Sequence, residues 1–181
     1  MRYCGGKSRI AGWLAEQIAP FRAGRRLVEP FCGGLSATVA LQPQLASDAS
    51  VPLIHLIRAC RRNFARCGRN ALLRKITATR NTEFRLSSYD QLQIGAGDLV
   101  YCDPPYSKTT FGYSTGRWDA DRFWVWARGR AEAGAIVVVS EFSAPPDVEL
   151  LATKSARTYL HTKHRTSATY ENLYILRGGS L

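Results

Sequence analysis

The stretch Leu99–Tyr106 constrains the fold of this chain more than any other, because it joins a strand signal to a rigid polar end. Its first four residues are apolar, which predicts a short buried strand. Asp103 follows at once, and Pro104 and Pro105 restrict the backbone beyond it. In an open parallel α/β sheet, ligands bind at the carboxyl ends of the strands. We therefore expect an α/β fold with Asp103 at a ligand-binding edge.

The end of this strand predicts a corner that is rich in hydrogen-bond acceptors. The two prolines have no N–H group, so only their carbonyls and the Asp103 carboxylate remain. Such a corner suits a ligand that donates hydrogen bonds, such as an amino group, and Tyr106 adds a flat ring for stacking. An ordinary loop is the alternative, which Pro-Pro alone would favour. Because the whole tetrapeptide follows a buried strand, we assign as candidate catalytic residues Asp103, Pro104, Pro105 and Tyr106.

Length and composition predict one globular domain over residues 1–181, with 45% hydrophobic residues. The chain has no run of 18 apolar residues and no apolar leader, so we expect a cytoplasmic protein. Its five cysteines are scattered without paired spacing. We therefore expect reduced thiols, no disulfide and no metal site.

Seven segments have strand-like composition, and four have helical patterns. The expected strands are 27–28, 45–48, 82–86, 99–102, 135–139, 158–161 and 173–176. The expected helices are 10–18, ended by Pro20 and Gly24, then 35–41, a helix that starts near Val51, and 122–133.

A glycine turn, Glu29–Gly34, lies between the first strand and a helix, which is the nucleotide-binding arrangement of doubly wound folds. It lacks the full Gly-x-Gly-x-x-Gly pattern and a P-loop lysine, which favours a nucleoside ligand over a phosphate. Asp48 ends the next strand, roughly 20 residues beyond the start of the turn, where a ribose-binding carboxylate belongs. The alternatives are a tight structural turn and, for Asp48, a cap of the helix near Val51.

Residues 51–82 contain no acidic residue. Leu53, Ile57, Cys60 and Phe64 share one helical stripe and the arginines fall largely off it, which predicts a basic amphipathic helix. The net charge of +11 comes mostly from arginine, which favours contacts with phosphate. A solvated basic face is the alternative. The candidate nucleic-acid-binding residues are Arg58, Arg62, Arg66, Arg69 and, after the catalytic segment, Lys108.

Three motifs occur in the order used by Dam-like (class alpha) DNA adenine methyltransferases, which the chain resembles: Tyr3–Lys7, Glu29–Gly34 and Asp103–Tyr106. Weaker matches lie at 47–48, 84–89, 138–142 and 171–176. The resemblance implies S-adenosylmethionine as the methyl donor. It also implies a doubly wound, mostly parallel, Rossmann-like sheet of seven strands with one antiparallel strand near the edge.

The resemblance implies roles for individual residues. Asp103, Pro104 and Tyr106 match the residues that hold the target base. Ser88 stands where many relatives have an acid near the adenine of the donor. The implied cofactor-binding residues are Tyr3, Gly6 and Lys7 in the amino-terminal segment, Glu29, Phe31 and Gly33 beneath the methionine part, Asp48 on the ribose, and Ser88 with Tyr89 near the adenine.

One expected region is short. Relatives insert a target-recognition region of many tens of residues between the equivalents of Asp48 and Phe84. Here about 35 residues lie there, which leaves little material for reading base edges. A short basic helical segment, 49–82, takes the place of that region.

We therefore expect methyl transfer to the N6 amine of adenine in DNA with relaxed specificity, by a small methylase of a prokaryote, phage or mobile element. The alternatives are transfer to RNA or to cytosine N4, and a degenerate, non-catalytic methylase that only binds nucleic acid. A further alternative is an enzyme completed by a recognition partner or by a second copy in a homodimer.

Overall fold

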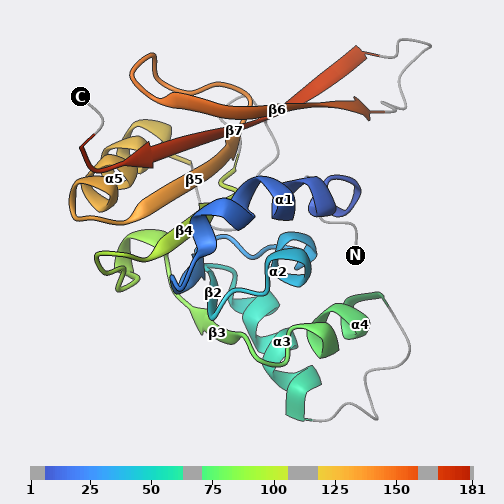
Figure 1. The fold of residues 1–181 in the computed structure, drawn as a ribbon. Coiled ribbons are helices and arrows are strands. Elements are labelled where there is room, and N and C mark those ends of the chain that lie inside the picture. Colours follow the sequence, from blue (N-terminus) through green and yellow to red (C-terminus); the bar gives the residue numbers. More distant parts are fainter. Residues whose placement is uncertain (1–6, 63–70, 106–117, 159–166, 180–181) are drawn as a thin grey trace.

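A computed structural model describes residues 7–62, 71–105, 118–158 and 167–179 (Figure 1). The strands are β1 Leu27–Glu29, β2 Leu45–Asp48, β3 Glu83–Leu86, β4 Leu99–Cys102, β5 Ile136–Glu141, β6 Glu149–Thr158 and β7 Ser167–Arg177. The helices are α1 Ala11–Arg22, α2 Ser36–Leu41, α3 Val51–Arg62, α4 Ala71–Ala78 and α5 Ala120–Glu132, with 3-10 turns η1 Lys7–Arg9 and η3 Tyr89–Gln91. None of the described helices is long and apolar enough to cross a bilayer.

The seven strands form one sheet in the order β3-β2-β1-β4-β5-β7-β6. All neighbours from β3 to β5 pair in parallel, and β7 runs antiparallel to both β5 and β6. This confirms the predicted α/β class, the strand number and the single reversed strand beside the edge. Strand order reverses at β1, because β2 lies on one side of it and β4 on the other. The carboxyl ends of β1 and β4 therefore flank the topological switch point of the sheet.

Alternation along the strands divides the core between the two faces of the sheet. In β4, Leu99 and Tyr101 pack in the cluster that contains the buried residues of α1 and α2. Val100 and Cys102 pack in the cluster that contains the aromatic residues of α5. Helices thus cover both faces, as a doubly wound fold requires. Helices α3 and α4 pack in a third cluster, with β2 and β3.

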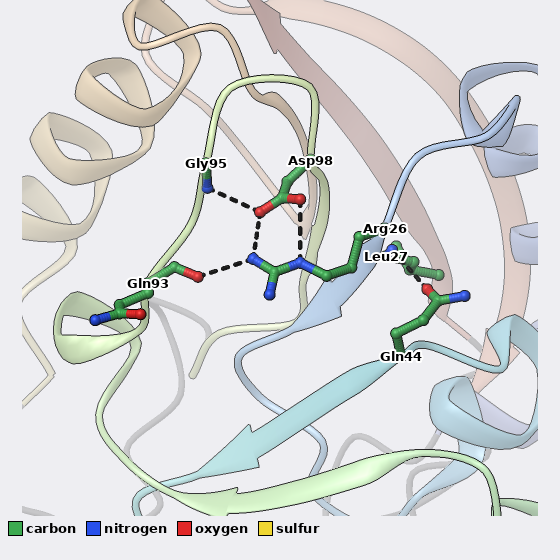
Figure 2. A network of polar contacts seen from close by, with 6 residues as sticks. All are labelled: Arg26, Leu27, Gln44, Gln93, Gly95 and Asp98. Carbon is green, nitrogen blue, oxygen red and sulfur yellow. Dashed lines mark hydrogen bonds and ion pairs between the residues drawn. The ribbon is translucent and has the colours of Figure 1, made fainter.

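The edge of the sheet where β1, β2 and β4 begin is closed by paired polar groups (Figure 2). The Arg26 guanidinium binds both carboxylate oxygens of Asp98, at 3.1 and 2.6 Å, and donates to the Gln93 carbonyl. The Gln44 side chain accepts from the Leu27 N–H at 2.8 Å. These contacts join the segments that precede the three strands, at the edge opposite to the one that the sequence predicts as the ligand site.

The closing hairpin differs from the prediction. We expected strands at 158–161 and 173–176, but β6 runs over Glu149–Thr158, and residues 159–166 lie outside the described part of the chain. As an edge strand, β6 has a mixture of half-buried and exposed side chains over residues 149–155 and carries Lys154, so it lacks the apolar signal used for the other strands. Strand β7 includes the expected 173–176 but begins earlier, at Ser167.

Helix α1 also exceeds its predicted range, because it continues through Pro20 to Arg22. The Arg22 guanidinium donates to the carbonyls of Leu41 and Gln42 at the end of α2. That contact anchors the last turn of α1 and offsets the loss of the helical hydrogen bond that Pro20, without an N–H group, cannot donate.

Candidate active site

Three acidic side chains stand at the carboxyl ends of three adjacent strands. Glu29 is the last residue of β1, Asp48 is the last residue of β2, and Asp103 directly follows β4. Because β2, β1 and β4 are neighbours in the sheet, these residues lie side by side at the switch point. They are close enough that the charges of Asp103 and Asp48 both affect the pKa of Glu29.

Glu29 is fully buried, and neither of its carboxylate oxygens has a hydrogen-bond partner among the described residues. Burial raises the pKa of Glu29 to about 8, the nearby Thr38 hydroxyl opposes the shift, and the charges of Asp103 and Asp48 add to it. A buried acid without partners is costly, so it marks a position where a ligand can supply what the protein does not. A cationic group is the ligand chemistry that fits an acid among other acids.

Asp48 binds the glycine turn. Its Oδ2 accepts from the Gly33 N–H at 3.1 Å, and its Oδ1 accepts from the Ser50 N–H at 2.8 Å. Burial raises the pKa of Asp48, while these two backbone hydrogen bonds oppose the shift. The turn needs glycine at position 33, where φ is +41°. Asp48 therefore holds the glycine turn and the residue before α3 in place, and its ribose role stays a prediction.

Lys7 reaches two carboxylates of the chain itself. Its Nζ lies 3.0 Å from Asp103 Oδ1 and 2.7 Å from Glu171 Oε1. Burial lowers the pKa of Lys7, but the charges and hydrogen bonds of Asp103 and Glu171 outweigh it, so the pKa is raised overall. The sequence placed Lys7 in a donor-binding segment and gave Glu171 no role. The available signal was an acid on the same face of the strand as the buried Leu173 and Ile175.

An aromatic cluster lies beside the glycine turn. Phe31 contacts Tyr89 with ring centroids 5.5 Å apart and Trp118 at 5.7 Å, and Tyr89 contacts Trp126 at 5.1 Å. Phe123 of α5 also packs against Phe31. The structure thus brings the predicted residues Phe31 and Tyr89 together. Trp118 was given no role in the sequence analysis.

Asp90 lies two residues after Ser88, in the turn η3. The Ser88 side chain and the Arg122 guanidinium lower the pKa of Asp90, and Arg122 binds Asp90 Oδ2 at 2.5 Å. Asp90 is therefore held by an arginine of α5.

Some of the remaining predicted residues lie in the described part of the chain and others lie outside it. Pro104 is buried and Pro105 half-buried directly after Asp103, and Arg58 and Arg62 are exposed on α3. Arg61, in contrast, donates to the carbonyls of Thr82 and Thr79 and supports the fold. The predicted residues outside the described part of the chain are Tyr3, Gly6, Arg66, Arg69, Tyr106 and Lys108. Among the described residues, no group of three His, Cys, Asp or Glu side chains is placed to hold a metal ion.

A family model supplies the identification. The model for the D12 class of N6 adenine-specific DNA methyltransferases matches residues 3–74 and 60–124. The chain belongs to this family. The matched residues include Glu29, Asp48 and Asp103, so the three acids at the switch point all fall within the part that defines this methyltransferase as a D12 member.

Solved structures agree on the fold of this D12 methyltransferase. A crystal structure of Thermoplasma acidophilum 1320 is 14% identical, with a TM-score of 0.58, and the alignment covers 94% of this chain and 89% of that one. The putative methyltransferase yhhF from Escherichia coli is also 14% identical, with a TM-score of 0.53 and coverage of 97% and 90%.

A putative RNA methyltransferase, PH1948 from Pyrococcus horikoshii, is 11% identical, with a TM-score of 0.54 and coverage of 98% and 87%. No curated protein matches the chain. At these identities the likeness to solved structures shows the fold alone.

Proposed function

We propose that this chain transfers a methyl group from S-adenosylmethionine to the exocyclic N6 amine of adenine in DNA, with relaxed sequence specificity. The observation that carries the proposal is Glu29, a buried acid that has no hydrogen-bond partner among the described residues and is flanked by Asp48 and Asp103 at the switch point of the sheet. Membership of the D12 family supports the chemistry.

The charges of the site suit this donor. S-adenosylmethionine, when bound, supplies an electrophilic methyl group on a positively charged sulfur, and it also carries an ammonium group and a ribose diol. Glu29 accepts a hydrogen bond from the ammonium, which gives its buried carboxylate the partner that it lacks among the described residues. Asp48 holds the ribose hydroxyls, and Phe31 and Tyr89 line the adenine side. The Gly33 turn lets the backbone approach the donor closely.

The target amine is held at the end of β4. The adenine amine is a weak nucleophile, because its lone pair is delocalised into the ring. The Asp103 carboxylate and the Pro104 carbonyl each accept a hydrogen bond from one N–H of this amine. These hydrogen bonds favour a pyramidal nitrogen and direct its lone pair toward the methyl group. The bond between N6 and the methyl carbon would form as the methyl–sulfur bond breaks, with the sulfur leaving as a neutral thioether and one N6 proton released, without a covalent enzyme intermediate. Holding both reactants in this geometry supplies much of the rate, up to roughly 7–11 kcal/mol of the barrier in favourable cases.

The base must leave the duplex to reach this corner, which costs a few kcal/mol. Tyr106 stacks on the flipped base. The basic helical segment 49–82 supplies phosphate contacts through the exposed Arg58 and Arg62 of α3. Phosphate contacts position a protein without specifying a sequence. A single domain with this short segment in place of a target-recognition region therefore methylates many sequence contexts.

Transfer of tritium from labelled S-adenosylmethionine, followed by nucleoside analysis, tests the proposal. We expect label in duplex DNA, recovered as N6-methyladenine, and little label in RNA. The variant Asp103→Ala should lower transfer at least 1000-fold and leave donor affinity within about threefold, because this carboxylate contacts the target amine and not the donor. Asp147→Ala, which removes an exposed acid paired with Arg128, is the matched control and should keep full activity.

Three outcomes would contradict the proposal. Label recovered from RNA or as N4-methylcytosine would replace the target. Donor binding without any transfer would indicate a degenerate, non-catalytic methylase. Full activity of the Asp103 variant would remove Asp103 from the mechanism.

A further inference from the structure

A buried ion-pair triad joins segments from opposite ends of the sequence at the candidate site. Lys7 Nζ contacts Asp103 Oδ1 at 3.0 Å and Glu171 Oε1 at 2.7 Å. The Lys7 side chain is 5% exposed, that of Glu171 is 11% exposed and that of Asp103 is 21% exposed. Asp103 is therefore the member of the triad that a substrate can reach most easily, and Glu171 is more deeply buried.

The alternation of the sheet explains why these three residues meet. Tyr101 in β4 and Leu173 in β7 both face the side of the sheet that α1 covers. Side chains two residues apart in a strand share a face, so Asp103 and Glu171 are directed to that same side. Lys7 lies in η1, directly before α1, and its ammonium contacts both Asp103 and Glu171.

Stability alone does not explain such a triad. Removing charges from water costs more than an ion pair usually returns, so a buried ion pair is weak evidence for a role in stability. Lys7 nevertheless stays charged, because two carboxylates offset the cost of burying it. One carboxylate, that of Asp103, is at the candidate catalytic position, and the second is that of Glu171.

We propose that Glu171 is a positioning residue, which acts through Lys7 to fix and orient the Asp103 carboxylate. This inference rests on the proposed function, because Asp103 is the acceptor for the target amine there. Glu171 holds the Lys7 ammonium at the position from which it binds Asp103 Oδ1. The carboxylate of Asp103 is then fixed before the base arrives and need not be ordered during the reaction.

The charged state of Lys7 gives this role a pH signature. The titratable groups that act on Lys7 are Asp103, directly after β4, and Glu171 on β7, and Asp103 in turn acts on Tyr101 of β4 and on Glu29 at the end of β1. Lys154 of β6 pairs with Glu171 in register, and its Nζ lies 5.5 Å from the centre of the Trp13 ring. Without the charge of Glu171, one of the two carboxylates that raise the pKa of Lys7 is lost, so Lys7 should lose its proton at a lower pH than in the unmodified protein. Methyl transfer should then fail at a pH where the unmodified protein is fully active.

The variants Glu171→Gln and Glu171→Asp test the proposal. Glutamine keeps the shape and can still accept from Lys7 but removes the charge, whereas aspartate keeps the charge on a shorter side chain. We expect Glu171→Gln to lower kcat about 10- to 100-fold, with KM for DNA and Kd for the donor within about twofold. Its activity should decline toward high pH earlier than that of the unmodified protein, and Glu171→Asp should restore part of the pH profile.

The control is Glu149→Gln, the same substitution in the same hairpin. Glu149 forms an exposed ion pair with Arg177 at 2.7 Å. It pairs with Ile175 in the hairpin, four residues along β7 from Glu171. This variant should leave kcat and the pH profile unchanged. Melting temperatures of all variants check that each one folds.

A readout that needs no activity separates the two proposals. Nζ-detected NMR of 15N-lysine-labelled protein, with Lys7 assigned through Lys7→Arg, reports the pKa of Lys7 directly. A lower Lys7 pKa in Glu171→Gln, together with the loss of kcat, supports the positioning role. An unchanged Lys7 pKa, or a KM effect alone, overturns it. If the unmodified protein transfers no methyl group while the Lys7 pKa still depends on Glu171, the proposed function fails and the ion-pair linkage stands.

Discussion

At the scale of single residues, the most informative feature is the buried carboxyl of Glu29. A fully buried acid without a partner among the described residues destabilises the free protein, and in our proposal the ammonium of the donor supplies the missing partner. The Glu29→Gln variant should weaken donor binding about 10- to 100-fold, because a charge-assisted hydrogen bond is lost. Isothermal titration calorimetry measures this directly, and unchanged donor affinity would contradict the role of Glu29.

The pH dependence of stability offers a second measurement on Glu29. The pKa is about 8 in the folded chain and 4.5 in an ordinary environment, so the unfolded chain ionises first as the pH rises. The free energy of unfolding of the donor-free protein should therefore fall between about pH 4.5 and pH 8, by up to ~1.4 kcal/mol per pH unit. Urea denaturation of Glu29→Gln should lack this contribution. An identical pH dependence in both proteins would show that Glu29 does not titrate as the structure indicates.

At the scale of elements, helix α3 carries the proposed contact with nucleic acid. Its buried stripe, Leu53, Ile57 and Cys60, packs on the sheet and leaves Arg58 and Arg62 exposed. Each of Arg58→Ala and Arg62→Ala should weaken DNA binding similarly for all sequences and reduce the slope of log K against log salt by about 0.9. Fluorescence anisotropy at several salt concentrations measures the slope.

The matched control for α3 is Arg128→Ala in α5, which packs on the other face of the sheet and whose arginine pairs with Asp147. This variant should not change the salt slope. Equal slopes for all three variants would place the DNA elsewhere on the molecule.

The elements that the sequence predicted best are the parallel strands. Leu45–Asp48 and Leu99–Cys102 were predicted with the bounds that the structure gives, because each is an apolar run ended by an acid. The edge strand β6 was placed wrongly, since none of its side chains over residues 149–155 is fully buried and its composition is mixed. Pro20 was taken as the end of α1, but a tertiary contact of Arg22 with the end of α2 overrides the local signal.

The candidate site was predictable only in part, for the same reason. Asp103 and Asp48 could be assigned because each stands at the end of a predicted strand, and strand ends meet at one edge of a parallel sheet. Glu29 was implied only by the family resemblance. The Lys7–Glu171 contact joins residues from the two ends of the sequence, and no local pattern predicts such a pairing. Trp118 likewise joins Phe31 only through the packing of α5 against the sheet.

At the scale of the whole molecule, the chain combines a complete set of acids at the switch point with a short basic segment where target recognition is expected. Its net charge of +11 attracts nucleic acid without selecting a sequence. The central claim is therefore an adenine methyltransferase of the D12 family that modifies DNA in many sequence contexts.

Methylome sequencing of DNA from an unmethylated host that expresses this chain tests that claim most directly, with the Asp103→Ala variant as the control. We expect N6-methyladenine in many short contexts, and none in the control. A single long methylated motif would contradict relaxed specificity, and DNA without N6-methyladenine would contradict the central claim itself.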